Sequence, residues 1–287
     1  MKLSIDGADL IQHPTTNPWN NSSLVAMLDH QTLNYLVWVS FSGLGNRILT
    51  LASAFLYAFL TDQALLVDRG VDMDDLSCEP FPGIFWLLPL DFPITDQFNS
   101  LDQNYPYCYG KMVQHDAATN FNGTARAPFV YLHLAHDYNF HDKLFFCDQD
   151  QSFLAKAPWL VMKTDNYSVP SPFLIPSFAQ ELNNLFLEKE TVFHLVCRYL
   201  FPQTNSVWGL ITRNYQAYLA KADERKGIQI RVFDTGVGPF QHILDQILAC
   251  TMKENLLPDI NLHDPVSSPS GIRKSKVVLM ISLNSVF

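Results

Sequence analysis

The regular pattern of hydrophobic and polar positions begins near residue 36. Leu36–Phe41 is a short run rich in β-branched and aromatic residues, and Ser42-Gly43-Leu44-Gly45-Asn46 after it is a glycine-containing turn. Arg47–Leu60 is apolar almost all round, like a helix buried in a core, and Ala64–Val67 is a second β-rich run. A strand, a tight turn, a helix and a strand form the building unit of a parallel sheet. We therefore predict an α/β fold with Leu36–Phe41 as a central strand and Arg47–Leu60 packed against it.

Further elements follow along the chain. Strands are predicted at Phe129–Leu134 and Trp159–Lys163, and helices at about Glu181–Phe186, Thr191–Phe201 and Ser206–Lys221. Gly227–Phe233 starts a new alternation of apolar and polar residues. The segment after it has the i, i+3, i+4 spacing of a half-buried helix, with apolar residues at Phe240, Ile243, Leu244, Ile247 and Leu248. A last strand is predicted at Val277–Ile281.

We interpret this order of elements as two α/β domains. Residues 1–33 form an irregular lead-in, residues 34–225 an N-terminal α/β domain, and residues 226–287 the start of a second domain. One helix between two strands cannot close a doubly wound domain, which needs five or six strands. We therefore expect the second domain to be incomplete in this chain.

Composition and charge exclude some classes of protein. The 287 residues are 48% hydrophobic and 16% charged, which is typical of a globular protein. The formal net charge of −9 argues against a nucleic-acid-binding protein, because such proteins carry clustered lysine and arginine. A nucleotide ligand needs only one or two local cations, so the charge does not exclude one.

The glycine-containing turn allows two interpretations. Gly43 and Gly45 let backbone N–H groups approach an anion, and the N-terminus of the following helix adds a partial positive charge. Arg47 is placed to add a charge-assisted hydrogen bond. The alternative is a tight turn of the kind found in any α/β protein, because the pattern is shorter than a dinucleotide or P-loop fingerprint.

Two charged residues also allow two interpretations each. Arg231 lies within the predicted strand Gly227–Phe233, where burial requires a partner for its charge. It either pairs with a core carboxylate or holds a phosphate with two hydrogen bonds.

Asp165 follows the strand Trp159–Lys163, at the kind of strand end where α/β proteins bind ligands. It is either a general base or the start of a turn, and the residues alone favour the turn.

The sequence shows no strong metal-binding pattern. Asp72-Met73-Asp74-Asp75 and Asp148-Gln149-Asp150 each contain D-x-D, which holds a divalent cation and a diphosphate in one class of glycosyltransferase. Closely spaced aspartates are common, however, and they also favour helix starts. His133, His136 and His141 lack a fourth ligand at useful spacing, and the five cysteines lack C-x-x-C spacing. We predict no metal site and ordinary polar roles for these histidines.

Targeting signals are mixed. Glycosylation sequons begin at Asn20, Asn21, Asn122 and Asn166, and together with three central cysteines they favour a secretory lumen. The start of the chain is polar and acidic, unlike a signal peptide. The longest apolar run, Ile48–Leu60, is shorter than the roughly 20 residues of a membrane span. We therefore expect this sequence to contain no membrane anchor.

Seven segments together closely resemble the plant galactoside α-1,2-fucosyltransferases that act on xyloglucan. In chain order they are Ser42–Leu49, Leu66–Gly70, Asp72–Leu76, Cys78–Gly83, Pro158–Leu160, Lys163–Tyr167 and Gly227–Phe233. The resemblance extends from about Tyr35 to the C-terminus. It implies the two-Rossmann-domain fold called GT-B, a Golgi location and no metal requirement. It also implies transfer of L-fucose from GDP-fucose to O2 of a galactosyl residue, with inversion at the anomeric carbon.

The resemblance also implies roles for individual residues. Arg231 matches the arginine that holds the donor pyrophosphate and stabilises GDP as it leaves, where a preorganised cation lowers the barrier. The loop Gly43–Arg47 matches a loop that faces the cleft, with Asn46 as the expected direct contact. Asp165 matches a carboxylate near the reacting hydroxyl, whose proton needs an acceptor. We expect Asn46 and Asp165 to lie at one cleft.

The chain departs from the family pattern at both ends. The family's anchor and stem do not precede Tyr35, and its later nucleotide-binding segments are expected beyond Phe287. The expected consequences are weak binding of GDP and little transferase activity in this chain. The alternative to an active fucosyltransferase is a non-catalytic fragment or a glycan-binding remnant of the family.

Overall fold

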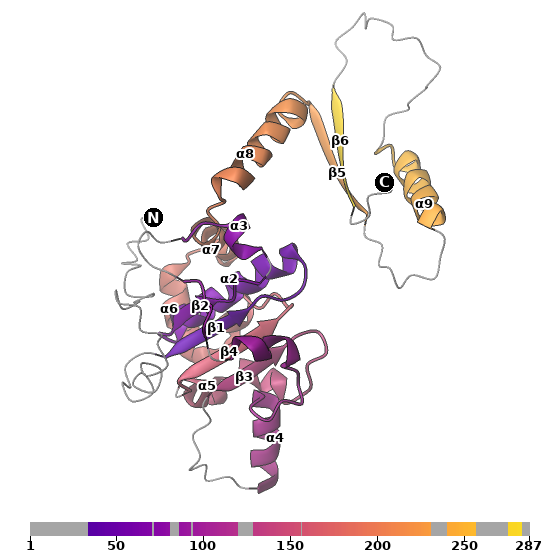
Figure 1. Ribbon diagram of the computed structural model, residues 1–287. Helices are drawn as coiled ribbons and strands as arrows, with labels where there is room; N and C mark the ends of the chain where they lie inside the picture. The colour runs from indigo at the N-terminus through magenta and orange to yellow at the C-terminus, as the bar shows by residue number, and fades with distance from the viewer. Residues whose placement is uncertain are drawn as a thin grey trace, which may run out of the picture. The chain divides into compact units, whose positions relative to one another are not determined.

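The structure is a computed structural model. It describes residues 34–70, 72–80, 86–92, 94–119, 129–155, 157–230, 240–256 and 275–282. The chain divides into two compact units, Met1–Thr204 and Asn205–Phe287 (Figure 1). This division by packing lies before the predicted start of the second domain at residue 226, and the functional domain limits stay a prediction.

The first unit is built on a sheet of four parallel strands in the order β2-β1-β4-β3. The strands are β1 (Tyr35–Val39), β2 (Ala64–Val67), β3 (Val130–Leu134) and β4 (Trp159–Thr164). β1 is central as predicted, because β2 pairs with one of its edges and β4 with the other. The α/β prediction is therefore confirmed.

Six α-helices and four short 3₁₀ helices surround this sheet in the described part of the first unit. The α-helices are α2 (Leu44–Leu60), α3 (Met73–Leu76), α4 (Tyr109–Thr119), α5 (Asp148–Leu154), α6 (Pro176–Leu185) and α7 (Val192–Leu200). The 3₁₀ helices are η1 (Thr95–Ser100), η2 (Asp142–Phe146), η3 (Ser171–Leu174) and η4 (Lys189–Thr191). None of the helices in the described ranges is long and apolar enough to cross a membrane.

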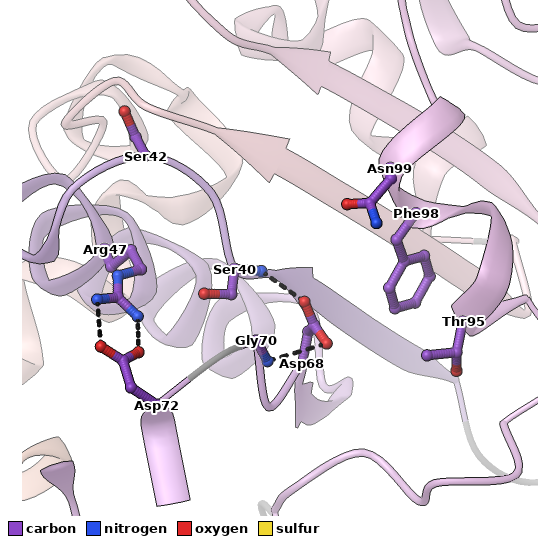
Figure 2. A pocket seen from close by; sticks show the side chains of 9 residues that line it. All are labelled: Ser40, Ser42, Arg47, Asp68, Gly70, Asp72, Thr95, Phe98 and Asn99. Atoms are coloured by element: carbon purple, nitrogen blue, oxygen red, sulfur yellow. Dashed lines mark hydrogen bonds and ion pairs between the residues drawn. The ribbon is translucent and has the colours of Figure 1, made fainter. Parts of the chain in front are cut away.

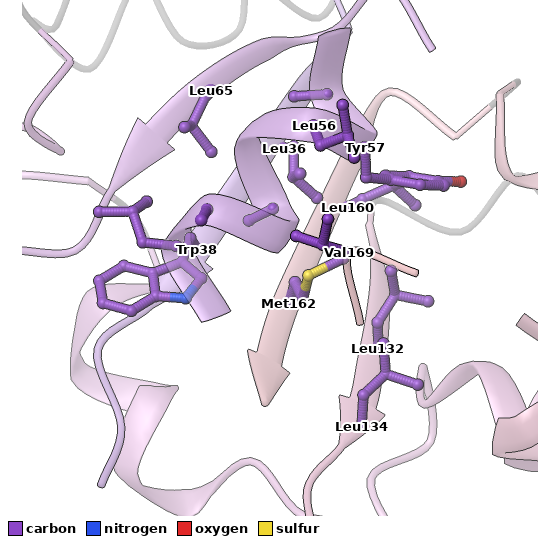
Figure 3. Packing of buried hydrophobic residues seen from close by; sticks show 14 of the residues in the cluster. Leu36, Trp38, Leu56, Tyr57, Leu65, Leu132, Leu134, Leu160, Met162 and Val169 are labelled. Carbon is purple, nitrogen blue, oxygen red and sulfur yellow. The ribbon is translucent and has the colours of Figure 1, made fainter. Parts of the chain in front are cut away.

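Alternate residues of the strands enter two separate cores, because successive side chains of a strand point to opposite faces. On one face, Leu36 and Trp38 of β1 pack with Leu160 and Met162 of β4 and with buried residues of α2 (Figure 3). On the other face, Val37 and its neighbours pack against apolar residues between 88 and 108. Both faces of the sheet are thus covered, which is typical of parallel sheets. The predicted packing of the helix after β1 is confirmed.

The second unit contains a pair of parallel strands, β5 (Glu224–Ile230) and β6 (Lys276–Ser282). α8 (Asn205–Asn214) continues into a π-helical turn, η5 (Tyr215–Leu219), where the sequence predicted one helix. In α9 (Phe240–Lys253), the four apolar residues from Ile243 to Leu248 are half-buried, as the spacing predicted.

β5 begins three residues earlier than the hydrophobic alternation predicted. Its first residues, Glu224, Arg225 and Lys226, are charged, so the apolar pattern did not reveal them. The Glu224 carboxylate binds the ammonium groups of Lys226 and Lys276 at 3.0 and 3.1 Å. Cross-strand charge pairing therefore extends the strand beyond its apolar part.

Candidate functional site

The candidate site lies at the carboxyl edge of the four-stranded sheet. Because the strands are parallel, the segments that follow them all leave the sheet at this edge. Ser40 follows β1, Asp68 follows β2, His136 lies two residues beyond β3, and Asp165 follows β4. Open α/β sheets bind their ligands at this edge.

A pocket of about 410 Å³ opens at the ends of β1 and β2 (Figure 2). Its walls come from the loop after β1, the first turn of α2, the loop after β2, and η1. The lining residues are Ser40, Ser42, Arg47, Asp68, Gly70, Asp72, Thr95, Phe98 and Asn99. Its volume is within the range of small-molecule sites.

Asp68 holds the two loops of this pocket together. Its Oδ2 accepts the Ser40 N–H at 3.1 Å, and its Oδ1 accepts the Gly70 N–H at 3.3 Å (Figure 2). Burial raises the pKa of Asp68, and the two N–H groups partly oppose this effect. Gly70 has a φ of +54°, and a Cβ there would lie 2.6 Å from the Ser40 hydroxyl. Only glycine fits this close approach.

Arg47 is already paired within the pocket. Both of its Nη groups bind the carboxylate of Asp72, the residue just before α3, and the Nη2 to Oδ2 distance is 3.1 Å (Figure 2). The Arg47 side chain is only 12% exposed, and its Nε is buried without a partner in the described residues. From the sequence, Arg47 was a candidate for binding an anion. In the structure, two of its three guanidinium nitrogens donate to the Asp72 carboxylate instead.

The ion pair makes a pH-dependent prediction. The hydrogen bond from Arg47 lowers the pKa of Asp72. A lowered folded-state pKa stabilises the fold above the unfolded value of about 3.9, and this contribution is lost as the pH falls through the folded-state pKa. Because Asp72 is 40% exposed, we expect a contribution of about 1 kcal/mol at most.

The measurement is an NMR titration of the Asp72 carboxyl in the wild type and in Arg47→Met. We expect the substitution to raise the pKa of Asp72. Arg69→Met is the matched control, because Arg69 pairs with Asp74 and not with Asp72. An unchanged Asp72 titration in Arg47→Met would show that the pair does not form in solution.

Local packing does not require the glycines of the turn after β1. A Cβ on Gly43 or Gly45 would meet no heavy atom within 4 Å, and the residue with positive φ in this turn is Ser42, at 70°. The first turn of α2 has no acidic residue and no side-chain cap. The backbone here is open to a ligand and keeps its partial positive charge, which favours the anion-binding interpretation. The Asn46 amide is near this loop, 3.4 Å from the Ser42 hydroxyl.

Asp165 and His136 form a pair at the ends of β4 and β3. The His136 Nδ1–H donates to Asp165 Oδ2 at 2.7 Å. The Asp165 side chain is 10% exposed, whereas that of His136 is 75% exposed. Asp165 Oδ1 is buried and has no hydrogen-bond partner among the described residues. The hydrogen bond to Asp165 and the charge of that carboxylate raise the pKa of His136, with a smaller contribution from the charge of Asp137.

The structure corrects the turn interpretation of Asp165. The turn is made by its neighbours: Thr164 Oγ1 accepts the Asn166 N–H at 3.1 Å, and Asn166 Nδ2 donates to the Leu134 carbonyl at 2.8 Å. The Asp165 carboxylate takes no part in this turn and binds His136 instead. The hydrogen bond to the Leu134 carbonyl also occupies the side-chain amide of Asn166, the asparagine of the last sequon.

The remaining predicted site residues are only partly brought together. Asp165 and the Gly43–Arg47 loop follow the adjacent strands β4 and β1, so they lie at the same edge of the sheet. Of these residues, Arg47 lines the pocket, whereas Gly43, Gly45, Asn46 and Asp165 are not among its lining residues. A single cleft for Asn46 and Asp165 stays a prediction. Arg231 lies outside the described residues.

Three of the four D-x-D aspartates have other partners. Asp72 pairs with Arg47 and Asp74 with Arg69, and Asp148 accepts the Ser177 N–H at 3.0 Å. Within the part of the chain that the structure describes, no three His, Cys, Asp or Glu side chains are grouped to hold a metal ion. All five cysteines lie in that part, and none forms a disulfide.

Sequence reasoning missed several residues of the site. Asp68 directly follows a predicted strand, so the strand-end rule applied to Asp165 would also have found it. His136 was weighed as a metal ligand and then predicted to have an ordinary polar role. Thr95, Phe98 and Asn99 have no such signal, because η1 reaches the pocket only through the folding of a long connection.

The fold and the site define an α/β protein with a polar pocket at the carboxyl edge of a parallel sheet. Comparison with known proteins gives the family: the model for xyloglucan fucosyltransferase matches residues 23–287. The chain belongs to the xyloglucan fucosyltransferase family.

Individual relatives agree with this family. The chain is 62% identical over 251 residues to a galactoside 2-alpha-L-fucosyltransferase of Pisum sativum, covering 88% of this chain and 44% of the relative. It is 60% identical over the same length to one of Arabidopsis thaliana, with the same coverage. The chain thus spans less than half the length of these curated relatives. A solved structure of a mutant of Arabidopsis thaliana FUT1 in complex with GDP has a TM-score of 0.75 and 55% identity, covering 94% of this chain and 59% of that chain.

Proposed function

We propose that the protein is a fucosyltransferase that moves L-fucose from GDP-fucose to O2 of a galactosyl residue of xyloglucan. The observation that carries the proposal is the 62% identity over 251 residues to the Pisum sativum galactoside 2-alpha-L-fucosyltransferase. The pocket and the charged side chains at the carboxyl edge support it, because α/β proteins bind their ligands there.

The proposed reaction is a single displacement with inversion at the anomeric carbon. The oxygen of the acceptor hydroxyl bonds to C1 of fucose while the bond from C1 to the diphosphate breaks, and that electron pair leaves with GDP. The hydroxyl proton must be accepted as its oxygen attacks. We place this proton transfer at the end of β4, where the buried Asp165 carboxylate binds the exposed imidazole of His136.

The donor diphosphate needs positive charge at the leaving oxygen. By the family resemblance we assign this role to Arg231, since a preorganised cation stabilises charge that develops in the transition state. Gly43, Gly45 and Asn46 are assigned to donor contact at the open first turn of α2. Arg47 can bind a phosphate only after it releases Asp72, because both Nη groups are occupied and its Nε is buried.

We propose that no metal ion takes part and that the compartment is the Golgi lumen. Asp72 and Asp74 are neutralised by arginines, so neither carboxylate is free to hold a cation with a diphosphate. The sequons and the family resemblance support the Golgi compartment. A transfer that requires manganese, is abolished by a chelator and returns when manganese is restored would contradict the first statement.

The test incubates the purified 287-residue protein with GDP-fucose and a galactosylated xyloglucan oligosaccharide. Mass spectrometry should detect the addition of one deoxyhexose to this acceptor and none to an oligosaccharide without galactose. We expect Arg231→Ala to lower the rate by about 100-fold or more, the usual effect of removing a transition-state donor.

The possible results separate the competing functions. Product from the wild type would contradict the expectation, drawn from the sequence, of little activity. Binding of the oligosaccharide without transfer would favour the glycan-binding alternative. Calorimetry with GDP tests the expectation of weak nucleotide binding, which micromolar affinity would contradict.

A further inference from the structure

The imidazole of His136 is exposed at the carboxyl edge of the sheet. It is hydrogen-bonded to the buried carboxylate of Asp165. Leu134, the last residue of β3, pairs in register with Thr164, the last residue of β4. His136 and Asp165 therefore leave the sheet side by side, and the 2.7 Å hydrogen bond from Nδ1 to Oδ2 joins them.

The Asp165 carboxylate is not open to an acceptor sugar. Its Oδ2 is occupied by His136, and its Oδ1 is a buried atom. The side chain as a whole is 10% exposed. A glycan hydroxyl can therefore reach the imidazole of His136, which is 75% exposed, but neither carboxylate oxygen.

The surroundings leave the second nitrogen of His136 available. His136 Nε2 makes no hydrogen bond with the residues that the structure describes. The charged groups that act on the ring are Asp165, and more weakly Asp137. The Asp137 carboxylate is itself bound by His133 Nε2 at 2.7 Å, so it does not compete with Asp165 for the His136 ring.

We propose that His136 is the catalytic residue that accepts the acceptor's hydroxyl proton, and that Asp165 is the positioning residue that orients it. This inference rests on the proposed transfer reaction and specifies its base. Donation of Nδ1–H to the carboxylate keeps the lone pair on Nε2. The hydroxyl proton moves to Nε2 as the sugar oxygen bonds to C1 of fucose, and GDP leaves with the electrons of the broken bond. The resulting imidazolium is stabilised by the Asp165 carboxylate.

The assignment predicts a specific pH profile. The neutral form of His136 is the active one, so kcat/KM should fall as the pH drops through the pKa of His136. Asp165 raises that pKa, and the adjacent Asp137 adds to the effect. Asp165→Asn should therefore move this limb of the profile to lower pH as well as reduce the rate.

The test compares His136→Gln, His136→Ala and Asp165→Asn with the wild type in the transfer assay with GDP-fucose and galactosylated xyloglucan oligosaccharide. We expect His136→Gln to lower kcat/KM by about 100-fold or more with an unchanged melting temperature, within the usual range for loss of a general base. Added imidazole should restore part of the activity of His136→Ala, and the acidic limb should be absent from the profile of His136→Gln. His194→Gln is the matched control, because His194 is also an exposed histidine of the first unit.

Each alternative result has a definite meaning. Activity of His136→Gln within a few-fold of the wild type, together with loss in Asp165→Asn, would overturn the assignment and make Asp165 the base. Equal loss in His194→Gln would show a general effect of histidine removal and would also overturn it. If the wild type transfers no fucose, the proposed function fails and the assignment fails with it. If the wild type is active but His136→Gln is not impaired, only the assignment fails.

Discussion

Replacement of Gly110 with alanine should lower the free energy of unfolding by about 3–5 kcal/mol, because overpacking and the loss of hydrogen bonds to a buried carboxylate add together. A Cβ on Gly110 would lie 2.1 Å from Asp142 Oδ1 and 3.0 Å from the Asp142 backbone nitrogen. Movement of the side chain alone cannot relieve the second contact. The Asp142 backbone would have to move as well.

Asp142 cannot move without loss of hydrogen bonds. It is 1% exposed, and it accepts the Gly110 N–H at 3.1 Å and the Asn139 N–H at 3.1 Å. The Cys108 thiol lies 3.5 Å from the same carboxylate, and burial together with the Asp142 charge raises the pKa of Cys108 to about 12. A displaced carboxylate in this position would be buried without its donors, which is costly.

Gly45→Ala is the matched control. Gly45 and Gly110 are each the second residue of a helix in the first unit, but a Cβ on Gly45 would meet no atom within 4 Å. We expect Gly45→Ala to leave stability unchanged or raise it by up to about 1 kcal/mol, from helix propensity. Urea denaturation followed by circular dichroism measures both. Equal stability of the two variants would show that the contact between Gly110 and Asp142 is absent in solution.

Trp38→Ala should lower the free energy of unfolding by about 3–5 kcal/mol, the usual cost of a large cavity in a core. Trp38 lies in the central strand β1, is fully buried, and contacts the helix α2 side of the sheet (Figure 3). Its indole N–H donates to Thr50 Oγ1 at 3.2 Å. Because Ser40 is two residues further along the chain, the same change should disturb the loop that Asp68 holds at the pocket.

Thr50→Val separates the hydrogen bond from the packing. This substitution keeps the shape of the side chain but removes the acceptor, so it should cost about 1–2 kcal/mol. A loss below about 1 kcal/mol in Trp38→Ala would mean that the core rearranges to fill the cavity. Urea denaturation of the two single variants and the double variant would also give the coupling energy between the two residues. We expect the losses of the single variants not to add up to the loss of the double variant, because the residues are in contact.

The four strands, helix α2 and helix α7 of the first unit could be predicted from the sequence, because their burial requires a pattern of apolar residues; α3, α4 and α5 were not predicted. β2 was predicted with its exact limits, and β1 and β4 within two residues at each end. Apolar residues in β1 reflect a strand buried on both faces, and the apolar run after it reflects a helix with eight buried residues. In the second unit the start of β5 was missed because Glu224–Lys226 are charged, and there a cross-strand ion pair between Glu224 and Lys276 supports the strand.

The sequence by itself determined which residues follow strand ends, and so it selected Asp165 and the Gly43–Arg47 loop as candidates. The tertiary structure decided their partners. Arg47 meets Asp72 across 25 positions and Asp165 meets His136 across 29, because the order β2-β1-β4-β3 brings the ends of particular strands together. Local periodicity reports only whether a residue is buried. Which side chain lies beside it depends on strand order and register, and these are set by packing of the whole sheet.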